Sequence, residues 1–308
     1  MHRLLKLFGI LLLASASLAQ AGPPPKPAAI PAGVKEIADL VFASPIGHAL
    51  KLDLFLPEKP QGKLPVVVWI YGGAFMENNQ KQQEGEAAWL ALHGYAVAAI
   101  EHRESGEALF PAQIEDCKAA VRWLRGNAAK YGLDPHHVGA WGGSSGGNLA
   151  AMLGTTGGVK ELNGKDVNPE YANETSRVQA VVDFFGPTDF LQMDAHALPN
   201  GMKHDSANSP ESKYVGGAIQ QNPEKVERAN PMTYVSADDP PFFIVHGQQD
   251  PLVPLNQSQL LFAALKKAGV NVTFYEIAGA EHGGPEFGTP MIRAAVLAFF
   301  DQHLKTAN

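Results

Sequence analysis

The sequence of 308 residues predicts an α/β fold, in which helices cover both faces of a mostly parallel central sheet. Two observations predict this fold. Short, continuous apolar runs rich in Val, Ile and Phe recur along the chain, as is typical of strands buried on both faces. Helical apolar periodicity separates these runs, and strands that alternate with helices imply crossover connections between parallel strands.

The first predicted strand covers residues 49–57, where Leu alternates with other residues as in a half-buried antiparallel edge strand. The later apolar runs are predicted as buried strands over 65–71, 95–101, 137–141, 178–185, 241–247 and 272–278. Helical patterns lie between them, at 84–93, 112–131, 147–154, 256–268 and 290–304. Ligands bind such sheets at the carboxyl ends of the strands, so polar residues directly after strands are the functional candidates.

The N-terminal residues 1–21 are typical of a signal peptide. Arg3 and Lys6 precede an apolar run at 7–13, and small residues follow it. The run is shorter than the roughly 20 residues that span a bilayer. Residues 22–33 are Pro-rich and predict an extended linker. We therefore expect an exported protein, periplasmic or secreted, without a membrane span in its mature form and with one folded domain over 34–308.

Composition argues against a nucleic-acid partner and against an intrachain disulfide. The formal net charge is −7 and Lys and Arg do not cluster, which argues against a nucleic-acid partner. The single cysteine, Cys117, cannot form an intrachain disulfide. It lies on the apolar face of a helical pattern, so we expect a buried, unreactive thiol.

The stretch "WGGSSGG" (141–147) fits the pattern G-x-S-x-G twice, with Ser144 or with Ser145 at its centre. It joins a predicted strand to a predicted helix, which is the setting of a nucleophile elbow. Strand and helix pass so close at such a turn that glycines must flank the serine. Ser144 fits better, because its crowded positions fall on Gly142, Gly146 and Gly147, whereas Ser145 would place Asn148 at the last of them.

A serine nucleophile needs a base and a group that orients the base. His282 follows the last predicted strand in a glycine-rich loop, which suits a catalytic base. The other histidines with an interpretable position fit less well: His2 lies in the signal peptide, His303 in the last helix, and His136 and His137 at the wrong end of a strand. His246 lies late in an apolar run and is interpreted as a core or supporting residue.

Two aspartates are candidates for the orienting acid. Asp250 follows the predicted strand 241–247, in a loop stiffened by prolines, and Asp189 follows the strand before it. We favour Asp250, which gives the chain order Ser144, Asp250, His282 found in hydrolases with a nucleophile elbow.

The oxyanion of an acyl-transfer reaction needs N–H donors. The stretch "WIYGGAF" (69–75) follows a strand and offers the N–H groups of Gly73 and Ala74. The N–H of Ser145, directly after the nucleophile, completes the predicted oxyanion hole. The second serine is therefore expected to act through its backbone and not through its hydroxyl.

Together these motifs resemble α/β-hydrolase esterases of the hormone-sensitive-lipase-like and bacterial feruloyl-esterase-like branches. The similar stretches are "YGGAF", "WGGSSGGNLA", "PPFFIVHGQQDPLVP" and "AEHGG", within about 40–304. The resemblance implies a carboxylic ester hydrolase that needs no cofactor and no metal, on an eight-stranded sheet. Two residues depart from the family pattern: Tyr71 stands for the usual histidine, and Ser145 for the common alanine.

Substrate preference is expected to reside in two irregular segments, 155–177 and 190–239, of which the second predicts a small cap over the strand ends. The residues predicted to line an acyl or aryl pocket are Phe75, Met76, Leu191, Met193 and Tyr214. Alternatively, these side chains only pack the cap. A long apolar lid helix is not evident, which disfavours long-chain lipids as substrates.

The sequence thus predicts a serine carboxylesterase acting on short-acyl or aryl esters of the acetyl or feruloyl type, either small molecules or linked to a polysaccharide. One alternative is a serine exopeptidase of the prolyl-oligopeptidase kind, which usually carries an additional large domain for which 34–308 has no room. Another is a non-enzymatic binding protein on a hydrolase fold, but such proteins typically lack a triad member.

Overall fold

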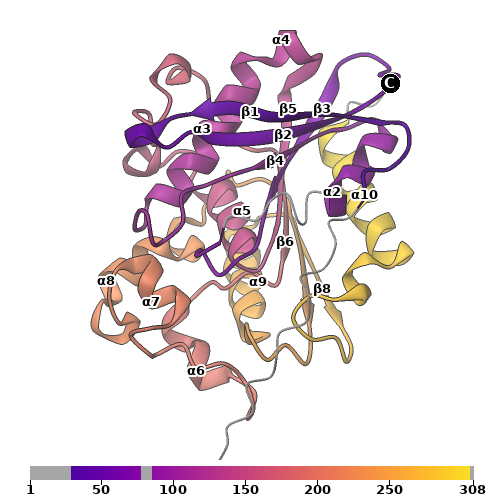
Figure 1. The fold of residues 1–308 in the computed structure, drawn as a ribbon. Helices are drawn as coiled ribbons and strands as arrows, with labels where there is room; N and C mark the ends of the chain where they lie inside the picture. The colour runs from indigo at the N-terminus through magenta and orange to yellow at the C-terminus, as the bar shows by residue number, and fades with distance from the viewer. Residues whose placement is uncertain (1–28, 78–84, 306–308) are drawn as a thin grey trace, which may run out of the picture.

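The computed structural model describes residues 29–77 and 85–305. Eight strands form one sheet in the order β1-β2-β4-β3-β5-β6-β7-β8 (Figure 1). The strands are β1 (Val34–Ala43), β2 (Leu50–Pro57), β3 (Leu64–Ile70), β4 (Ala96–Ile100), β5 (Leu133–Gly143), β6 (Ala180–Phe184), β7 (Phe242–Gly247) and β8 (Val272–Ile277). Only the pairs β1–β2 and β2–β4 are antiparallel. The predicted mostly parallel sheet is confirmed, and the predicted signal peptide lies outside the described residues.

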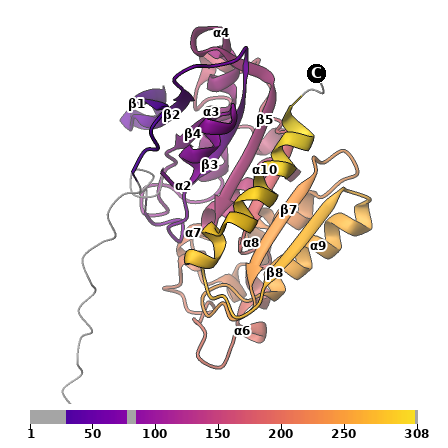
Figure 2. The ribbon, with the colours of Figure 1, turned by 90° about the vertical axis from the view of Figure 1, so that its right-hand side faces the viewer.

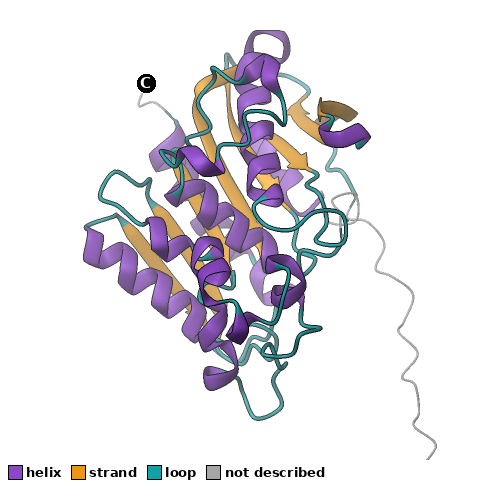
Figure 3. Ribbon diagram, turned by 90° about the vertical axis from the view of Figure 1, so that its left-hand side faces the viewer, coloured by secondary structure: helices purple, strands orange, loops and turns teal. Residues whose placement is uncertain are grey.

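Helices cover both faces of the sheet. On one face lie α3 (Ala112–Gly126), α5 (Ser145–Thr155) and α9 (Asn256–Ala268), and on the other lie α2 (Gly85–Ala88), η2 (Trp89–His93) and α10 (Pro290–Leu304). Figure 2 shows the side on which α10 runs across the sheet, and Figure 3 shows the opposite side. Each face buries its own apolar cluster, and Cys117 lies in the first of them, buried as predicted.

Two elements differ from the prediction. Strand β1 is absent from the prediction, because its apolar residues do not alternate strictly with polar ones and two register shifts interrupt its pairing. It pairs with β2, so β2 is an inner strand and the expectation of an edge strand at 49–57 is wrong. The predicted helix 112–131 divides into α3 and α4 (Ala128–Tyr131) around Asn127, whose side chain donates to the carbonyl of Trp123 at 2.9 Å.

The two irregular segments form short helical turns. Residues 155–177 contain η3 (Lys160–Leu162) and η4 (Pro169–Tyr171). Residues 190–239 contain η5 (Phe190–Gln192), α6 (Met193–His196), α7 (Pro210–Val215), η6 (Ile219–Gln221), α8 (Pro223–Ala229) and η7 (Pro231–Tyr234). Figure 1 shows α6, α7 and α8 grouped at one end of the molecule, far from α4. The remaining turns are η1 (Pro45–Gly47) and η8 (Pro285–Gly288).

Within the described ranges, no helix is long and apolar enough to cross a membrane.

Candidate active site

The turn between β5 and α5 holds Ser144 in a backbone conformation that side-chain-bearing residues rarely adopt, with φ 56° and ψ −127°. Its neighbours must be glycines, because a Cβ on Gly142 would overlap the carbonyl of Gly146 and a Cβ on Gly146 would overlap the carbonyl of Ile70. A Cβ on Gly147 would overlap the carboxylate of Asp183. Close packing of strand, helix and neighbouring strands therefore forces this turn and raises Ser144 at the carboxyl end of the sheet.

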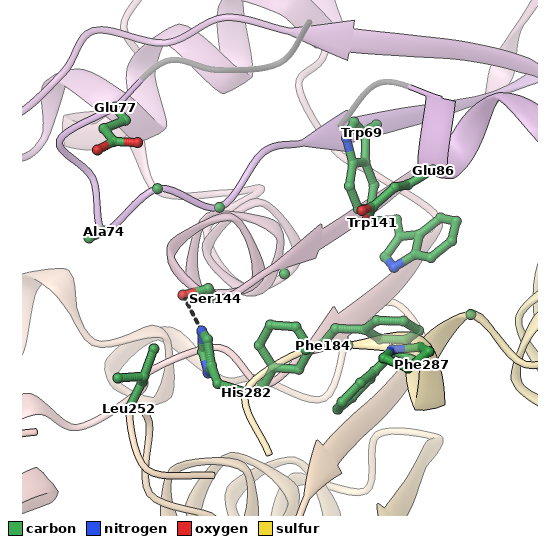
Figure 4. Close-up of a pocket in the computed structure, with 18 of the residues that line it drawn as sticks. Trp69, Ala74, Glu77, Glu86, Trp141, Ser144, Phe184, Leu252, His282 and Phe287 are labelled. Atoms are coloured by element: carbon green, nitrogen blue, oxygen red, sulfur yellow. Dashed lines mark hydrogen bonds between the residues drawn. The ribbon is translucent and has the colours of Figure 1, made fainter. Parts of the chain in front are cut away.

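The structure brings together Ser144, His282 and Asp250, which follow three different strands. Nε2 of His282 lies 2.9 Å from Oγ of Ser144, and Nδ1 lies 2.7 Å from Oδ2 of Asp250 (Figure 4). The rival acid, Asp189, instead accepts hydrogen bonds from the N–H of Leu191 and the side chain of Gln192. Of the two predicted acids, Asp250 is the one in contact with the histidine.

Asp250 is buried in a tight turn that holds both of its oxygens. Oδ1 accepts the N–H groups of Leu252 and Val253, each at 2.8 Å. Oδ2 faces His282 and also Nε2 of His246, at 3.3 Å. Burial opposes ionisation, but hydrogen bonds from His246 and His282 hold the pKa of the Asp250 carboxyl well below its usual range. Asp250 is therefore an anion that accepts from His282, and His246 has the supporting position that the sequence indicated.

The oxyanion loop after β3 departs from the prediction at Gly73. Its N–H donates to Oγ of Ser145 at 2.9 Å, so it is not free to bind substrate in this structure. Among the described residues, no acceptor takes the N–H of Ala74 or of Ser145. The expectation that the hydroxyl of Ser145 plays no part is therefore wrong, since it accepts the hydrogen bond from Gly73. Ser145 is the first residue of α5, so its side chain reaches the neighbouring loop.

A cleft of about 750 Å³ opens beside Ser144 and His282, towards α2 and α10. Its aromatic walls are Trp69, Trp89, Trp141, Phe184, Phe185 and Phe287. Figure 4 shows Trp69, Trp141, Phe184 and Phe287 on one side of the Ser144–His282 pair and Leu252 on the other.

The cleft also carries charge. Glu77, Glu86 and Arg293 line it, and the guanidinium of Arg293 lies 5.6 Å from the ring centre of Trp89. Partial burial raises the pKa of the Glu86 carboxyl, and the positive charge of Arg293 offsets part of this rise. Glu86 remains accessible to solvent. In the part of the chain that the structure describes, no group of three or more His, Cys, Asp or Glu side chains is placed to hold a metal ion.

Four of the five residues predicted to line the substrate pocket do not line the cleft. Of the five residues, Met76 lines the cleft, whereas Phe75 and Tyr214 stack on each other in the core with ring centres 3.8 Å apart. Met193 is buried, and Leu191 lines a separate cavity of about 290 Å³ together with Asp189. Both irregular segments are described in full, and neither contributes a residue to the cleft. Their apolar side chains pack against the core, which is the alternative the sequence left open.

The sequence analysis did not identify the aromatic residues that line the cleft, although their positions at the ends of strands indicated them. Trp69, Trp141 and Phe184 lie at or near the carboxyl ends of β3, β5 and β6. All three belong to the apolar cluster on the α10 face of the sheet. Large aromatic residues at the ends of neighbouring parallel strands face the region where ligands bind, so they were candidates for the cleft.

The sheet order, the strained elbow and the three side chains around it define the class of the protein as an α/β-hydrolase. The chain belongs to the BD-FAE family, whose profile matches residues 52–265. This confirms the resemblance to the hormone-sensitive-lipase-like and feruloyl-esterase-like branches.

Two similar proteins are an esterase and a probable carboxylic ester hydrolase, in keeping with this family. Esterase LipQ of Mycobacterium tuberculosis is 32% identical over 228 residues, which cover 72% of this chain and 51% of LipQ. The probable carboxylic ester hydrolase LipM of the same organism is 31% identical, over 77% of this chain and 53% of LipM. The chain thus spans about half the length of the curated relatives it matches.

Two solved structures are similar throughout the fold. A truncated carbohydrate esterase from gut microbiota is 35% identical with a TM-score of 0.78, covering 87% of this chain and 95% of that one. A bifunctional GH43-CE protein of Bacteroides eggerthii is 38% identical with a TM-score of 0.79, covering 88% of this chain and 35% of that one.

Proposed function

We propose that this chain hydrolyses carboxylic esters through an acyl-enzyme intermediate, with Ser144 as nucleophile, His282 as general base and Asp250 as the orienting acid. The observation that carries the proposal is the continuous chain of hydrogen bonds from Ser144 Oγ through both ring nitrogens of His282 to Asp250, at 2.9 and 2.7 Å. A serine hydroxyl reacts at neutral pH only when a positioned base takes its proton.

The reaction proceeds in two halves. Nε2 of His282 accepts the hydroxyl proton of Ser144 while Oγ attacks the ester carbonyl, and the anionic Asp250 stabilises the imidazolium that forms. His282 then donates the proton to the departing alkoxide, which leaves an acyl group on Ser144. Water attacks this acyl-enzyme, with His282 again as base, and the carboxylic acid is released.

The negative charge on the carbonyl oxygen is stabilised by the N–H groups of Ala74 and Ser145, which have no other acceptor among the described residues. Gly73 braces the loop through its bond to Ser145 Oγ. Its N–H joins the oxyanion hole if the substrate oxygen displaces that hydroxyl.

The proposed substrates are short-acyl or aryl esters of the acetyl or feruloyl type, free or attached to a polysaccharide. The aromatic cleft walls favour a flat or apolar group, and Glu86 with Arg293 offers a hydrogen-bond acceptor and donor to a polar substituent. One of the similar structures is a carbohydrate esterase from gut microbiota, which is consistent with a sugar-linked ester as substrate.

One assay decides between this function and its rivals. It compares p-nitrophenyl acetate, an aryl ester, with alanine p-nitroanilide, an aryl amide that carries the free amine an exopeptidase binds. Cleavage of the ester alone supports the proposal. Comparable cleavage of the amide would favour a peptidase, for which Glu77 and Glu86 in the cleft provide carboxylates to hold a substrate amine. Inertness towards both would favour a binding protein.

A second assay narrows the substrate. Initial rates on aryl esters of increasing acyl length, with methyl ferulate and acetylated xylan beside them, measure which acyl and alcohol groups the cleft accepts.

We also propose that the protein is exported, on the signal-peptide pattern of residues 1–21. N-terminal sequencing of protein from the periplasm and the medium tests that proposal, which predicts cleavage near Ala19 or Ala21.

A further inference from the structure

The segment 190–239 carries a buried histidine, His204, whose ring is bonded on both sides. Nδ1 lies 2.9 Å from Oε2 of Glu211, and Nε2 lies 2.9 Å from the carbonyl oxygen of Leu252. Its backbone N–H donates to Oδ1 of Asp194 at 2.6 Å. The side chain of His204 is 2% exposed and that of Glu211 is 6% exposed, so water does not replace these bonds.

The two partners fix the protonation state of His204. A carbonyl oxygen and a carboxylate oxygen both accept hydrogen bonds, so both ring nitrogens must donate. A neutral imidazole has one N–H group and can make only one of the two bonds, whereas an imidazolium makes both. Burial opposes the charge, but the hydrogen bond to Glu211 and its negative charge, with smaller effects of Leu252 and Asp194, raise the pKa of His204 above its usual value.

His204 thereby joins the irregular segment to the turn that holds Asp250. The carbonyl of Leu252 accepts from His204, and the N–H of the same residue donates to Oδ1 of Asp250 at 2.8 Å. Beside it, the N–H of Met202 donates to the carbonyl of Pro251 at 2.7 Å. The side chain of Leu252 lines the cleft near His282 (Figure 4). One histidine thus touches a residue that contacts both the acid and the substrate cleft.

We propose that His204 is a positioning residue of the active site. As an imidazolium bonded to Glu211, it donates to the carbonyl of Leu252 and fixes the turn that orients Asp250 towards His282. These two hydrogen bonds of His204 are called the clasp. This inference rests on the proposed function. It also makes the site sensitive to alkaline pH, because the clasp needs both protons. The ionisable groups that face this clasp are Glu211 on α7, Asp194 on α6 and, across the turn, Asp250.

The direction of the pH effect follows from the raised pKa of His204. A group whose pKa is higher in the folded protein than in the unfolded chain stabilises the fold fully below the unfolded value, and that contribution is lost as pH rises through the folded value. The clasp is therefore complete below about pH 6.5, the ordinary pKa of histidine, and it is lost as pH rises through the higher pKa of His204. We expect kcat to fall there as Asp250 and His282 lose their alignment.

The test compares kcat and KM for p-nitrophenyl acetate between about pH 6 and 10 in the full chain and three variants. In His204→Gln we expect kcat near neutral pH to fall on the order of 10-fold, with little change in KM and no further alkaline fall. In Glu211→Gln, loss of the carboxylate should move the alkaline fall to lower pH. His196→Gln, on an exposed residue of the same segment, is the matched control and should behave like the unmodified protein.

Two results would overturn the inference: an unchanged kcat and alkaline fall in His204→Gln, or an alkaline fall that stays in place in Glu211→Gln. The second variant decides the question if the first does not fold. An NMR titration of the His204 ring tests the clasp without turnover, and a value at or below that of a free histidine would contradict it. If the protein hydrolyses no ester but this titration shows a raised pKa, the proposed function fails while the clasp stands.

Discussion

Two aromatic regions look alike in the sequence and differ in the folded protein: one is open and borders the cleft beside Ser144, and the other is filled. On the open side, Trp69, Trp141 and Phe184 stand around a cleft of about 750 Å³. On the filled side, Phe75 and Tyr214 stack in parallel, with ring centres 3.8 Å apart and planes within 7°. The cleft rings contact one another edge-on, as Trp69 and Trp141 do with ring centres 4.9 Å apart, and leave space beside them, whereas Phe75 and Tyr214 fill the space between them by stacking face to face. The difference teaches that aromatic residues mark a pocket only where their packing leaves space.

The largest expected effect comes from Ser144, which lines the cleft on the open side. Ser144→Ala should lower kcat on the order of 10³- to 10⁶-fold without unfolding the protein, because no other group can form the acyl-enzyme. Ser145→Ala should stay within about tenfold, since alanine keeps the backbone N–H and loses only the bond to Gly73. The opposite ranking in steady-state kinetics would assign the nucleophile to Ser145.

The inactive Ser144→Ala protein also reports which side a substrate occupies. Three of the four tryptophans line the open side, whereas Trp123 lies on α3. Binding of an uncleaved aryl ester should therefore change the tryptophan fluorescence. Saturable binding without any change in fluorescence would place the ligand elsewhere.

A second comparison sets Asp250 against Asp189, which lines the separate small cavity. Asp250→Asn should lower kcat on the order of 10⁴-fold, because the amide no longer selects the productive tautomer of His282. Asp189→Asn removes only local bonds to Leu191 and Gln192 and should change kcat little. Both values come from the same aryl ester assay, and equal losses would contradict the assignment.

A side chain added on the open side should change substrate choice and not chemistry. A Cβ on Gly288 would meet only Nη2 of Arg293, at 4.0 Å, so Gly288→Leu fits at the edge of the cleft. We expect kcat/KM to fall roughly 10- to 100-fold for aryl-acyl esters and little for acetates. Gly106→Leu is the control, because a Cβ there meets nothing within 4 Å and Gly106 does not line the cleft. Equal losses on both ester types would show that the cleft does not hold the acyl group.

The smallest effect is expected on the filled side. The hydroxyl of Tyr214 is buried and has no hydrogen-bond partner among the described residues. Tyr214→Phe keeps the ring stack and removes this unpaired group, so the free energy of unfolding should rise by about 1 kcal/mol with no change in kcat. Denaturant titration measures the first and steady-state kinetics the second. A clear loss of activity would mean that this side takes part in substrate binding after all.

Much of this protein could be predicted from the sequence because the signals are local. Continuous apolar runs specify buried strands wherever they occur, and the glycines around Ser144 reflect a turn that leaves no space for a Cβ. Asp250 and His282 were found because each directly follows a strand, and parallel strands deliver their carboxyl ends to one edge of the sheet. Strand β1 was missed because its apolar residues neither alternate with polar ones nor form one continuous run.

Tertiary structure alone decided which aromatic region borders a cleft, what Gly73 binds and which groups surround His204. Each of these depends on a partner that is distant in the chain: Tyr214 covers Phe75, Ser145 takes the N–H of Gly73, and Leu252 accepts from His204. A side chain lines a cleft, packs in the core or carries a proton according to which groups surround it. Those groups come together only when the chain folds, so no local pattern encodes them.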